Sequence, residues 1–164
     1  MRLASRLLRQ PGRVKLIILW RSWRRKRKRF EPFLDREWRG VNLEQFGRAD
    51  LEMGKAQEYA LAAYEGGEMV GALVFKIDAG VGKLSQLLVA AGHRDKGVGG
   101  RLLSRFEELC QKEGCHKVRL ITYPDSRAEG FYSLHGYVRE GLLRRDLHGV
   151  DMSQMAKFLP EGKR

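Results

Sequence analysis

The chain has 164 residues, of which 43% are hydrophobic and 32% charged, and a formal net charge of +12. This is the composition of a soluble globular protein, and a chain of this length buries about two-thirds of its surface on folding, so one domain with a hydrophobic core is expected. With only two cysteines, a disulfide framework is not implied, and a reducing, cytoplasmic setting is the default expectation.

The whole excess of positive charge lies in residues 1–30, which contain twelve lysines and arginines and no acid. The remaining residues hold twenty cations and twenty acids and are therefore neutral. The longest apolar run, Leu16–Trp20, is too short to span a bilayer, and no small-residue cleavage site follows it. We therefore expect a basic N-terminal arm over residues 1–30 and a domain over residues 31–160.

The purpose of the basic arm stays open. Residues 14–20 could form the first strand of the domain, and a strand or a helix over 14–23 is favoured. The arginines could instead contact anionic lipid or the phosphates of nucleic acid. An organelle transit peptide or a solvated arm would also fit this composition.

Residues 30–57 are irregular, with pieces that fit two short helices punctuated by Gly40, Asn42, Gly47 and Gly54. Beyond them the pattern is clearer. The predicted elements are strands over Tyr59–Tyr64, Met69–Ile77 and Lys83–Ala90, a helix ending near Lys112, a strand over Lys117–Tyr123, a short helix opening at Pro124–Ser126, and strands over Tyr137–Leu143 and Val150–Leu159. The first two strands flank Glu-Gly-Gly-Glu, which favours a hairpin. This order predicts a single α+β domain with a mixed, mostly antiparallel sheet flanked by helices.

One stretch, from Val89 to Leu103, joins a strand to a helix through three glycines within four positions. A glycine-rich turn before a helix exposes unpaired N–H groups, which bind anions such as phosphate. The dinucleotide pattern Gly-x-Gly-x-x-Gly fails at Leu102, and no nucleotide-binding P-loop sequence occurs in the chain.

Two motifs resemble those of the GCN5-related N-acetyltransferase (GNAT) superfamily. The first is Arg94-x-x-Gly97-x-Gly99, which in that family closes on the pyrophosphate of acetyl-CoA. The second runs from Asp125 to Tyr137 and is similar to Asn-x-x-Ala-x-x-Phe/Leu-Tyr-x-x-x-Gly-Phe/Tyr. The motifs stand in the order that the family requires, with one helix and one strand between them, and the resemblance covers about residues 59–159.

The resemblance implies that acetyl-CoA is the acyl donor and that an amine attacks it directly in a ternary complex. It implies that Tyr132 faces the cleft as general acid for the leaving thiolate, with Phe131 in the core, and that the oxyanion is stabilised by the backbone N–H of Val89 or Leu88. The residues expected to bind acetyl-CoA are Leu87, Leu88, Val89, Arg94, Asp95, Lys96, Gly97, Val98, Gly99, Gly100, Arg101, Asp125, Ala128 and Tyr132. Two depart from the commoner family pattern, because Asp125 replaces Asn and Asp95 replaces Gly.

The sequence identifies neither the acceptor amine, which could belong to a small molecule or a protein, nor the general base. The strand before the loop carries only Ser85 and Gln86 where many family members have a carboxylate, and the remaining candidates are Glu58, Glu140 and His93. A non-catalytic acetyl-CoA-binding module, tethered by the basic arm to membrane or nucleic acid, is therefore the second function class to weigh. A homodimer is left open, and no metal site is expected.

Overall fold

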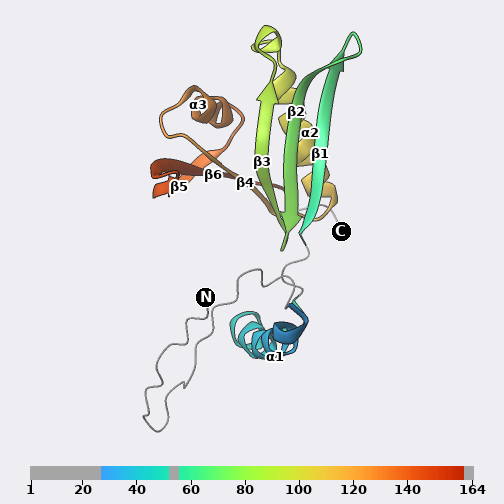
Figure 1. Cartoon of the computed structure of the whole chain (residues 1–164), viewed down its shortest axis with the longest axis vertical. Helices are drawn as coiled ribbons and strands as arrows, with labels where there is room; N and C mark the ends of the chain where they lie inside the picture. The colour runs from blue at the N-terminus through green and yellow to red at the C-terminus, as the bar shows by residue number, and fades with distance from the viewer. Residues whose placement is uncertain (1–26, 52–55, 161–164) are drawn as a thin grey trace, which may run out of the picture. The chain divides into compact units, whose positions relative to one another are not determined.

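A computed structural model describes residues 27–51 and 56–160 of the chain. Two compact units are distinguished, residues 1–51 and 52–164. The described part of the first unit contains helix α1 (Arg27–Phe46), and the second unit contains every described strand (Figure 1). The predicted first strand over residues 14–20 lies outside the described residues. No helix in the described ranges is long and apolar enough to cross a membrane.

Helix α1 is one continuous helix, so the prediction of two short helices was wrong. Gly40 and Asn42 lie inside it without interrupting it, because a glycine inside a helix costs only about 1 kcal/mol relative to alanine. The helix does end where a glycine was expected. Gly47 has a φ of 65°, and its N–H donates to the carbonyl of Leu43 at 2.9 Å. The predicted boundary between residues 30 and 31 lies within the first turns of this helix.

The second unit is built on a six-stranded sheet in the order β1-β2-β3-β4-β6-β5. Its elements are β1 (Gln57–Glu65), β2 (Glu68–Asp78), β3 (Val81–Val89), the 3₁₀ helix η2 (Ala91–His93), α2 (Val98–Lys112), β4 (Lys117–Thr122), α3 (Arg127–Leu134), β5 (Val138–Leu147) and β6 (Val150–Phe158). Only β3 and β4 pair in parallel. The predicted α+β fold with a mostly antiparallel sheet is confirmed.

Local sequence chemistry explains two of the connections. Gly66 and Gly67 have φ values of 59° and 87°, the two positive values that a type I′ turn needs, so the predicted β1–β2 hairpin is confirmed. Strand β5 extends four residues beyond the predicted Leu143. Its register against β6 shifts there, and Arg145, with a φ of 51°, donates its N–H to the Asp151 carboxylate at 2.8 Å.

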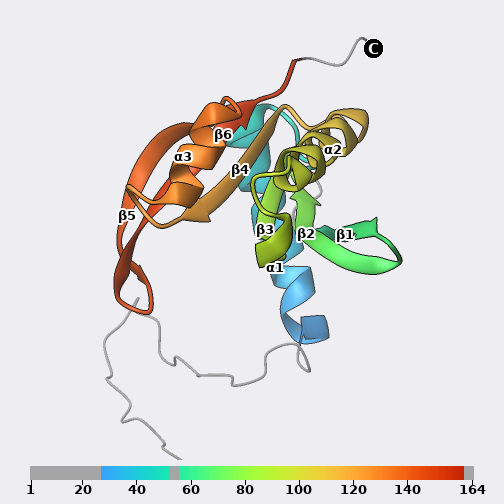
Figure 2. The same ribbon diagram turned by 90° about the horizontal axis from the view of Figure 1, so that it is seen from above.

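Helices α2 and α3 lie on the same face of the sheet. Lys157 of β6 binds Glu107 of α2 at 2.6 Å, and Arg139 of β5 binds Glu129 of α3 at 2.6 Å. Arg139 pairs with Met155, which is two residues from Lys157 and so shares its face. Figure 2 shows α2 beside β1–β3 and α3 beside the other three strands. One core cluster joins these layers, with Phe75, Leu103 and Phe106 at its centre.

The two halves of the sheet separate beyond a short seam. β3 and β4 pair only through residues 81–83 and 117–119. The second half of β3 is bent by a register shift at Ser85, between the pairs of Val74 and Phe75 with β2. Because β3 continues into α2 and β4 continues into α3, the divergence opens a space between the carboxyl end of β3 and α3.

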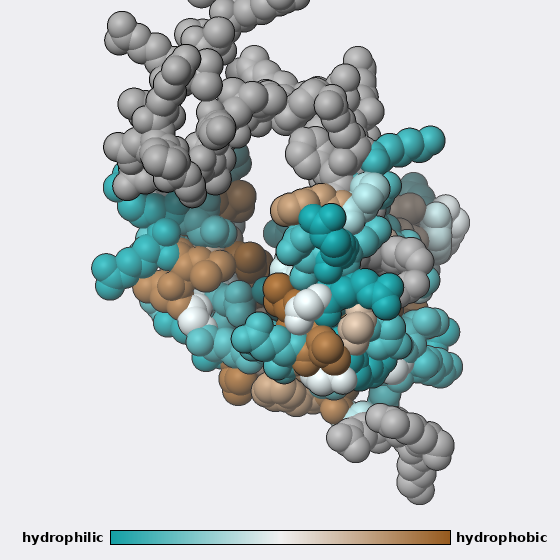
Figure 3. Space-filling view, turned by 90° about the horizontal axis from the view of Figure 1, so that it is seen from below, coloured by the Kyte–Doolittle hydropathy of each residue, from teal (hydrophilic) through white to brown (hydrophobic). Residues whose placement is uncertain are grey.

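Exposed apolar side chains occur on both units. On the face that Figure 3 presents, they lie in several small groups between hydrophilic residues rather than in one continuous patch. The more exposed ones include Phe33 and Phe46 of α1 and Leu88, Val138 and Phe158 of the sheet.

Candidate active site

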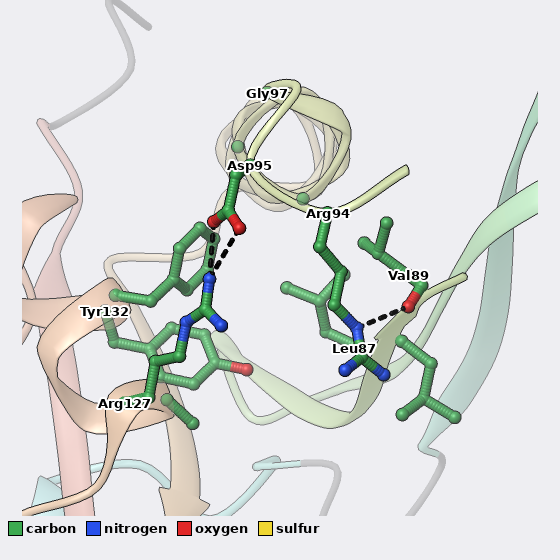
Figure 4. Close-up of a pocket in the computed structure, with 12 residues that line it drawn as sticks. Leu87, Val89, Arg94, Asp95, Gly97, Arg127 and Tyr132 are labelled. Carbon is green, nitrogen blue, oxygen red and sulfur yellow. Dashed lines mark hydrogen bonds and ion pairs between the residues drawn. The ribbon is translucent and has the colours of Figure 1, made fainter. Parts of the chain in front are cut away.

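A groove of about 440 Å³ occupies the space where β3 and β4 separate. It is bounded by the end of β3, the loop before α2, the first turn of α2 and one side of α3 (Figure 4). The residues that line it are Leu87, Leu88, Val89, Arg94, Asp95, Gly97, Gly99, Gly100, Arg127, Ala128, Phe131 and Tyr132. Segments far apart in the sequence therefore meet there.

The loop between β3 and α2 is held by its own side chains. Arg94 folds back so that its Nε donates to the carbonyl of Val89 at 3.1 Å. Asp95 and Gly97 adopt left-handed conformations, with φ values of 61° and 77°. Nε2 of His93 lies 2.9 Å from the carboxylate of Glu65 at the tip of the β1–β2 hairpin. These contacts turn the chain from the strand into the helix.

Helix α2 begins without any side-chain cap. Gly97 is its N-cap residue, and its first turn contains no acidic side chain. The packing of α3 explains Gly100, because a Cβ atom there would lie 2.9 Å from Nε2 of His135. A Cβ atom at Gly99 would make an ordinary contact of 3.4 Å with the ring of Phe131. The unpaired N–H groups and positive end of the helix dipole are thus presented at the groove, which suits an anion.

The register of β3 decides which backbone groups face the groove. The N–H of Ala90 donates to the carbonyl of Val70 on β2 at 2.9 Å. Because hydrogen-bonding direction alternates along an antiparallel strand, Leu88 also faces β2, whereas Leu87 and Val89 face away from it. The Val89 carbonyl, which accepts from Arg94, lies on that far side. β4 has already diverged there, so the N–H of Val89 is directed toward the open side of β3.

Tyr132 lies on α3 with only 7% of its surface exposed. Figure 4 shows its hydroxyl pointing into the groove, toward β3. Burial raises the pKa of this hydroxyl to about 12, so it keeps its proton at neutral pH. Phe131, predicted to lie in the core, packs against the core and also lines the groove. The two rings meet edge to face with centroids 5.2 Å apart.

Side chains at the start of α3 accept hydrogen bonds from backbone N–H groups there. Oγ of Ser126 accepts from the N–H of Glu129 at 3.2 Å, and Glu129 accepts from the N–H of Asp125 at 2.5 Å. Glu129 is buried and also binds Arg139, whose hydrogen bonds lower the pKa of that carboxyl to about 2. Ser126 is the N-cap of the short helix that was predicted to open at Pro124–Ser126.

Ten of the fourteen residues expected to bind the donor line the groove. The four that do not are Lys96, Val98, Arg101 and Asp125. Val98 is buried in the core, and Lys96 and Arg101 are exposed. The Asp125 side chain is 87% exposed and binds Arg139 at 2.8 Å.

Sequence reasoning missed Arg127, whose guanidinium binds the carboxylate of Asp95 at 2.6 and 2.7 Å. No signal in the sequence could have found this pair, because the two residues are 32 positions apart and an arginine in the first turn of a short helix usually faces solvent. The pairing exists because the groove brings the loop and α3 together.

None of the candidate general bases lines the groove. Glu140 binds Lys117 at 2.6 Å, which lowers the pKa of its carboxyl, and His93 is paired with Glu65. Asp95 is the one carboxylate among the lining residues, and Arg127 holds its pKa below the usual range. No cluster of three or more potential metal-ligating side chains occurs in the described residues.

Comparisons with known proteins agree with this geometry. A Bacillus subtilis protein named as an N-acetyltransferase is 32% identical over 77 residues, which are 47% of this chain and 54% of that protein. A mycothiol acetyltransferase of Geodermatophilus obscurus is 36% identical over 107 residues, which are 62% of this chain and 33% of that enzyme. The chain thus spans about half of the first of these curated relatives and about a third of the second.

Among solved structures, an acetyltransferase from Bacillus cereus superposes with a TM-score of 0.65 at 20% identity, covering 88% of this chain and 98% of that one, which shows the same fold. The model of the acetyltransferase (GNAT) family matches residues 17–137. Since that match spans well over half of the sequence, the chain belongs to the GNAT family of acetyltransferases.

Proposed function

We propose that this protein transfers the acetyl group of acetyl-CoA to an amine acceptor, which attacks the thioester directly while both substrates are bound. The observation that carries the proposal is the uncapped start of α2, which opens into a groove containing the Val89 N–H on one side and the Tyr132 hydroxyl on the other.

The groove suits the donor in charge and in shape. The N–H groups of the first turn of α2 would hold the diphosphate, supported by the guanidinium of Arg94. Beyond them the lining is largely apolar, with Leu87, Phe131 and Ala128, which suits the uncharged arm that carries the thioester. The end of β3 would then lie beside the reacting carbonyl.

The residues of the groove would supply the chemistry by position. The Val89 N–H would stabilise the negative charge that develops on the carbonyl oxygen when the amine attacks. The carbon–sulfur bond then breaks, and the Tyr132 hydroxyl would donate a hydrogen bond to the departing sulfur. A thiol has a pKa of roughly 8.5, well below the value of about 12 for Tyr132. Tyr132 therefore stabilises the thiolate mainly by hydrogen bonding, and the thiolate takes its proton from solvent.

The proton on the acceptor must leave before attack, because a primary amine with a pKa near 10 is almost wholly protonated at neutral pH. Since the lining offers no unpaired carboxylate, we infer that water accepts this proton and also the second proton that the nitrogen loses when the amide forms.

The acceptor class is an amine of a small molecule or of a protein. The family contains both kinds among the proteins compared, such as a probable glucosamine 6-phosphate N-acetyltransferase of rice and the ribosomal-protein-S18-alanine N-acetyltransferase of Escherichia coli. Contact of the basic arm at residues 1–30 with anionic lipid or nucleic acid, and formation of a homodimer, are secondary proposals that a salt titration and a sedimentation measurement would test.

The first test is a thermal-shift titration of the full-length protein with acetyl-CoA, with NAD and ATP as controls. At 100 times Kd, binding should stabilise the fold by about 2.7 kcal/mol. A shift confined to acetyl-CoA and CoA would support the donor assignment, and its absence would contradict it. Binding without acetyl transfer to any amine in a broad panel would instead favour a non-catalytic acetyl-CoA-binding module.

A further inference from the structure

An ion pair crosses the mouth of the groove. Asp95 comes from the loop before α2, and Arg127 is the first residue of α3. The Nη2 atom of Arg127 lies 2.6 and 2.7 Å from the two carboxylate oxygens of Asp95, and both side chains are 76% exposed. Figure 4 shows the pair bridging from the loop to α3, with the Tyr132 ring farther inside.

We propose that Arg127 is a phosphate-binding residue for the acyl donor, and that Asp95 holds it at the groove mouth until the donor arrives. On binding, the guanidinium exchanges the carboxylate of Asp95 for a phosphate of the donor. This proposal rests on the proposed function and adds a residue that determines selectivity for phosphorylated over unphosphorylated thioesters.

The energetics favour the exchange. An exposed ion pair contributes only about 0–1 kcal/mol, so breaking it costs little. A phosphate offers more negative charge and three acceptor oxygens, and arginine binds such groups through two parallel hydrogen bonds. Asp95 itself would lie near the phosphates as a like charge, so removing its negative charge should strengthen donor binding.

The lining leaves few other cations for this task. Arg94 and Arg127 are the two lining residues with a positive charge, and Arg94 has its Nε committed to the Val89 carbonyl. Lys96 and Arg101, expected from the sequence to serve the phosphates, do not line the groove in this structure. Arg127 is therefore the cation of the lining, besides Arg94, that is placed to meet a phosphate.

The test uses two probes, CoA and S-acetylpantetheine, which lacks phosphate, with affinity measured by calorimetry on the full chain. Arg127→Ala should weaken CoA binding about tenfold and leave S-acetylpantetheine binding unchanged. Asp95→Asn should strengthen CoA binding severalfold, because it releases Arg127 and removes a like charge. Arg105→Ala is the matched control, since Arg105 forms an exposed ion pair with Glu108 on α2, outside the groove lining.

The proposal predicts that CoA affinity falls in Arg127→Ala and rises in Asp95→Asn. An ion pair with a purely structural role would not change the affinity in opposite directions. If Asp95→Asn weakens CoA binding as Arg127→Ala does, or if both probes lose affinity together, the pair only braces the loop and the proposal is overturned. If Arg127→Ala leaves the CoA affinity unchanged, the role proposed for Arg127 is overturned and the proposed function is not affected. If the unmodified protein does not bind CoA, both are overturned. Melting temperatures equal to that of the unmodified protein show that each variant folds.

Discussion

The two helices that border the groove begin in opposite ways. At α3, the side chains of Ser126 and Glu129 satisfy backbone N–H groups of the first turn and of Asp125. At α2, the N-cap is Gly97, with no side-chain hydrogen bond and no acid in the first turn. Both helices follow a strand of the same sheet and pack on the same face, so their surroundings alone do not account for the contrast.

The difference separates a helix start that serves stability from one that is available to a ligand. A capped start has used its donors and adds an acid of its own, which repels an anion. An uncapped start forgoes about 1 kcal/mol of capping and keeps its donors and positive dipole end for another partner. The family resemblance predicts that the donor phosphates bind at α2, and the cap geometry is a second observation in favour of that prediction.

The largest change in acetyl-CoA affinity is expected when an acidic residue is placed at the start of α2. Gly99→Glu should weaken acetyl-CoA binding about 100-fold, or about 2.7 kcal/mol, because a fixed carboxylate would oppose the phosphates. An acid suits the first turn of a helix, and the melting temperature of the variant checks that it still folds. Calorimetry with acetyl-CoA measures the first effect.

Two controls accompany this variant. Gly99→Ala tests the Cβ alone, which would meet Phe131 at an ordinary 3.4 Å, and Gly130→Glu adds the same charge to α3, where a Cβ meets nothing within 4 Å. Equal losses of affinity in Gly99→Glu and Gly130→Glu would show that net charge matters and the helix start does not.

A second prediction concerns the side chain that α3 contributes instead of backbone donors. Tyr132→Phe should lower kcat by more than about tenfold with little change in acetyl-CoA affinity, because only the hydrogen bond to the leaving sulfur is lost. Steady-state kinetics with an identified acceptor check this. Tyr137→Phe, which removes a buried hydroxyl outside the groove lining, is the control. A kcat unaffected by Tyr132→Phe would remove this residue from the mechanism.

The hydrogen bonds of Glu129 at the start of α3 should make the free energy of unfolding depend on pH. The pKa of Glu129 is about 2 in the folded protein, below the usual value for glutamate. Its contribution to the free energy of unfolding is therefore present at neutral pH and is lost as pH falls from about 5 toward 2. Urea unfolding at pH 6 and pH 3 should show a smaller loss in Glu129→Gln than in the unmodified protein. Identical losses in the two proteins would mean that the Glu129 carboxyl does not contribute to the pH dependence of stability.

The smallest expected effect belongs to the cap itself. Ser126→Ala should lower the free energy of unfolding by about 1 kcal/mol, because the Glu129 N–H loses its acceptor. Ser104→Ala, in the interior of α2 on an exposed position, provides the comparison. If acetyl-CoA affinity fell in Ser126→Ala while stability did not, the assignment of this start to stability would be wrong.

Much of this architecture could be read from local sequence. Gly66-Gly67 specified the hairpin, and α2 ends at Lys112 as predicted, with Gly114 at a φ of 76° two residues beyond it. The predictions failed where the structure depends on distant residues or on the summed helix propensity of many residues. Gly40 looked like a break, yet the residues around it sustain one helix over 27–46.

The candidate site was predictable as far as its motifs extend. The glycines and Tyr132 occupy the groove because their spacing encodes a turn and a helix face. Sequence patterns could not show which backbone groups of β3 remain free, since that depends on register against β2 and on where β4 diverges. They also could not show that Asp95 reaches Arg127, or that Asp125 turns toward Arg139 instead of the groove.

The short seam between β3 and β4 also has a mechanical consequence. Each half of the sheet is stiffened by long antiparallel ladders, whereas three residue pairs join the halves along the backbone. Strain applied across the molecule should therefore concentrate at residues 81–83 and 117–119, and the groove should widen or narrow as the halves pivot there. A ligand that contacts both β3 and α3 would restrict the movement of one half of the sheet relative to the other. Ligand binding should therefore also reduce the motion of strands that do not contact the ligand.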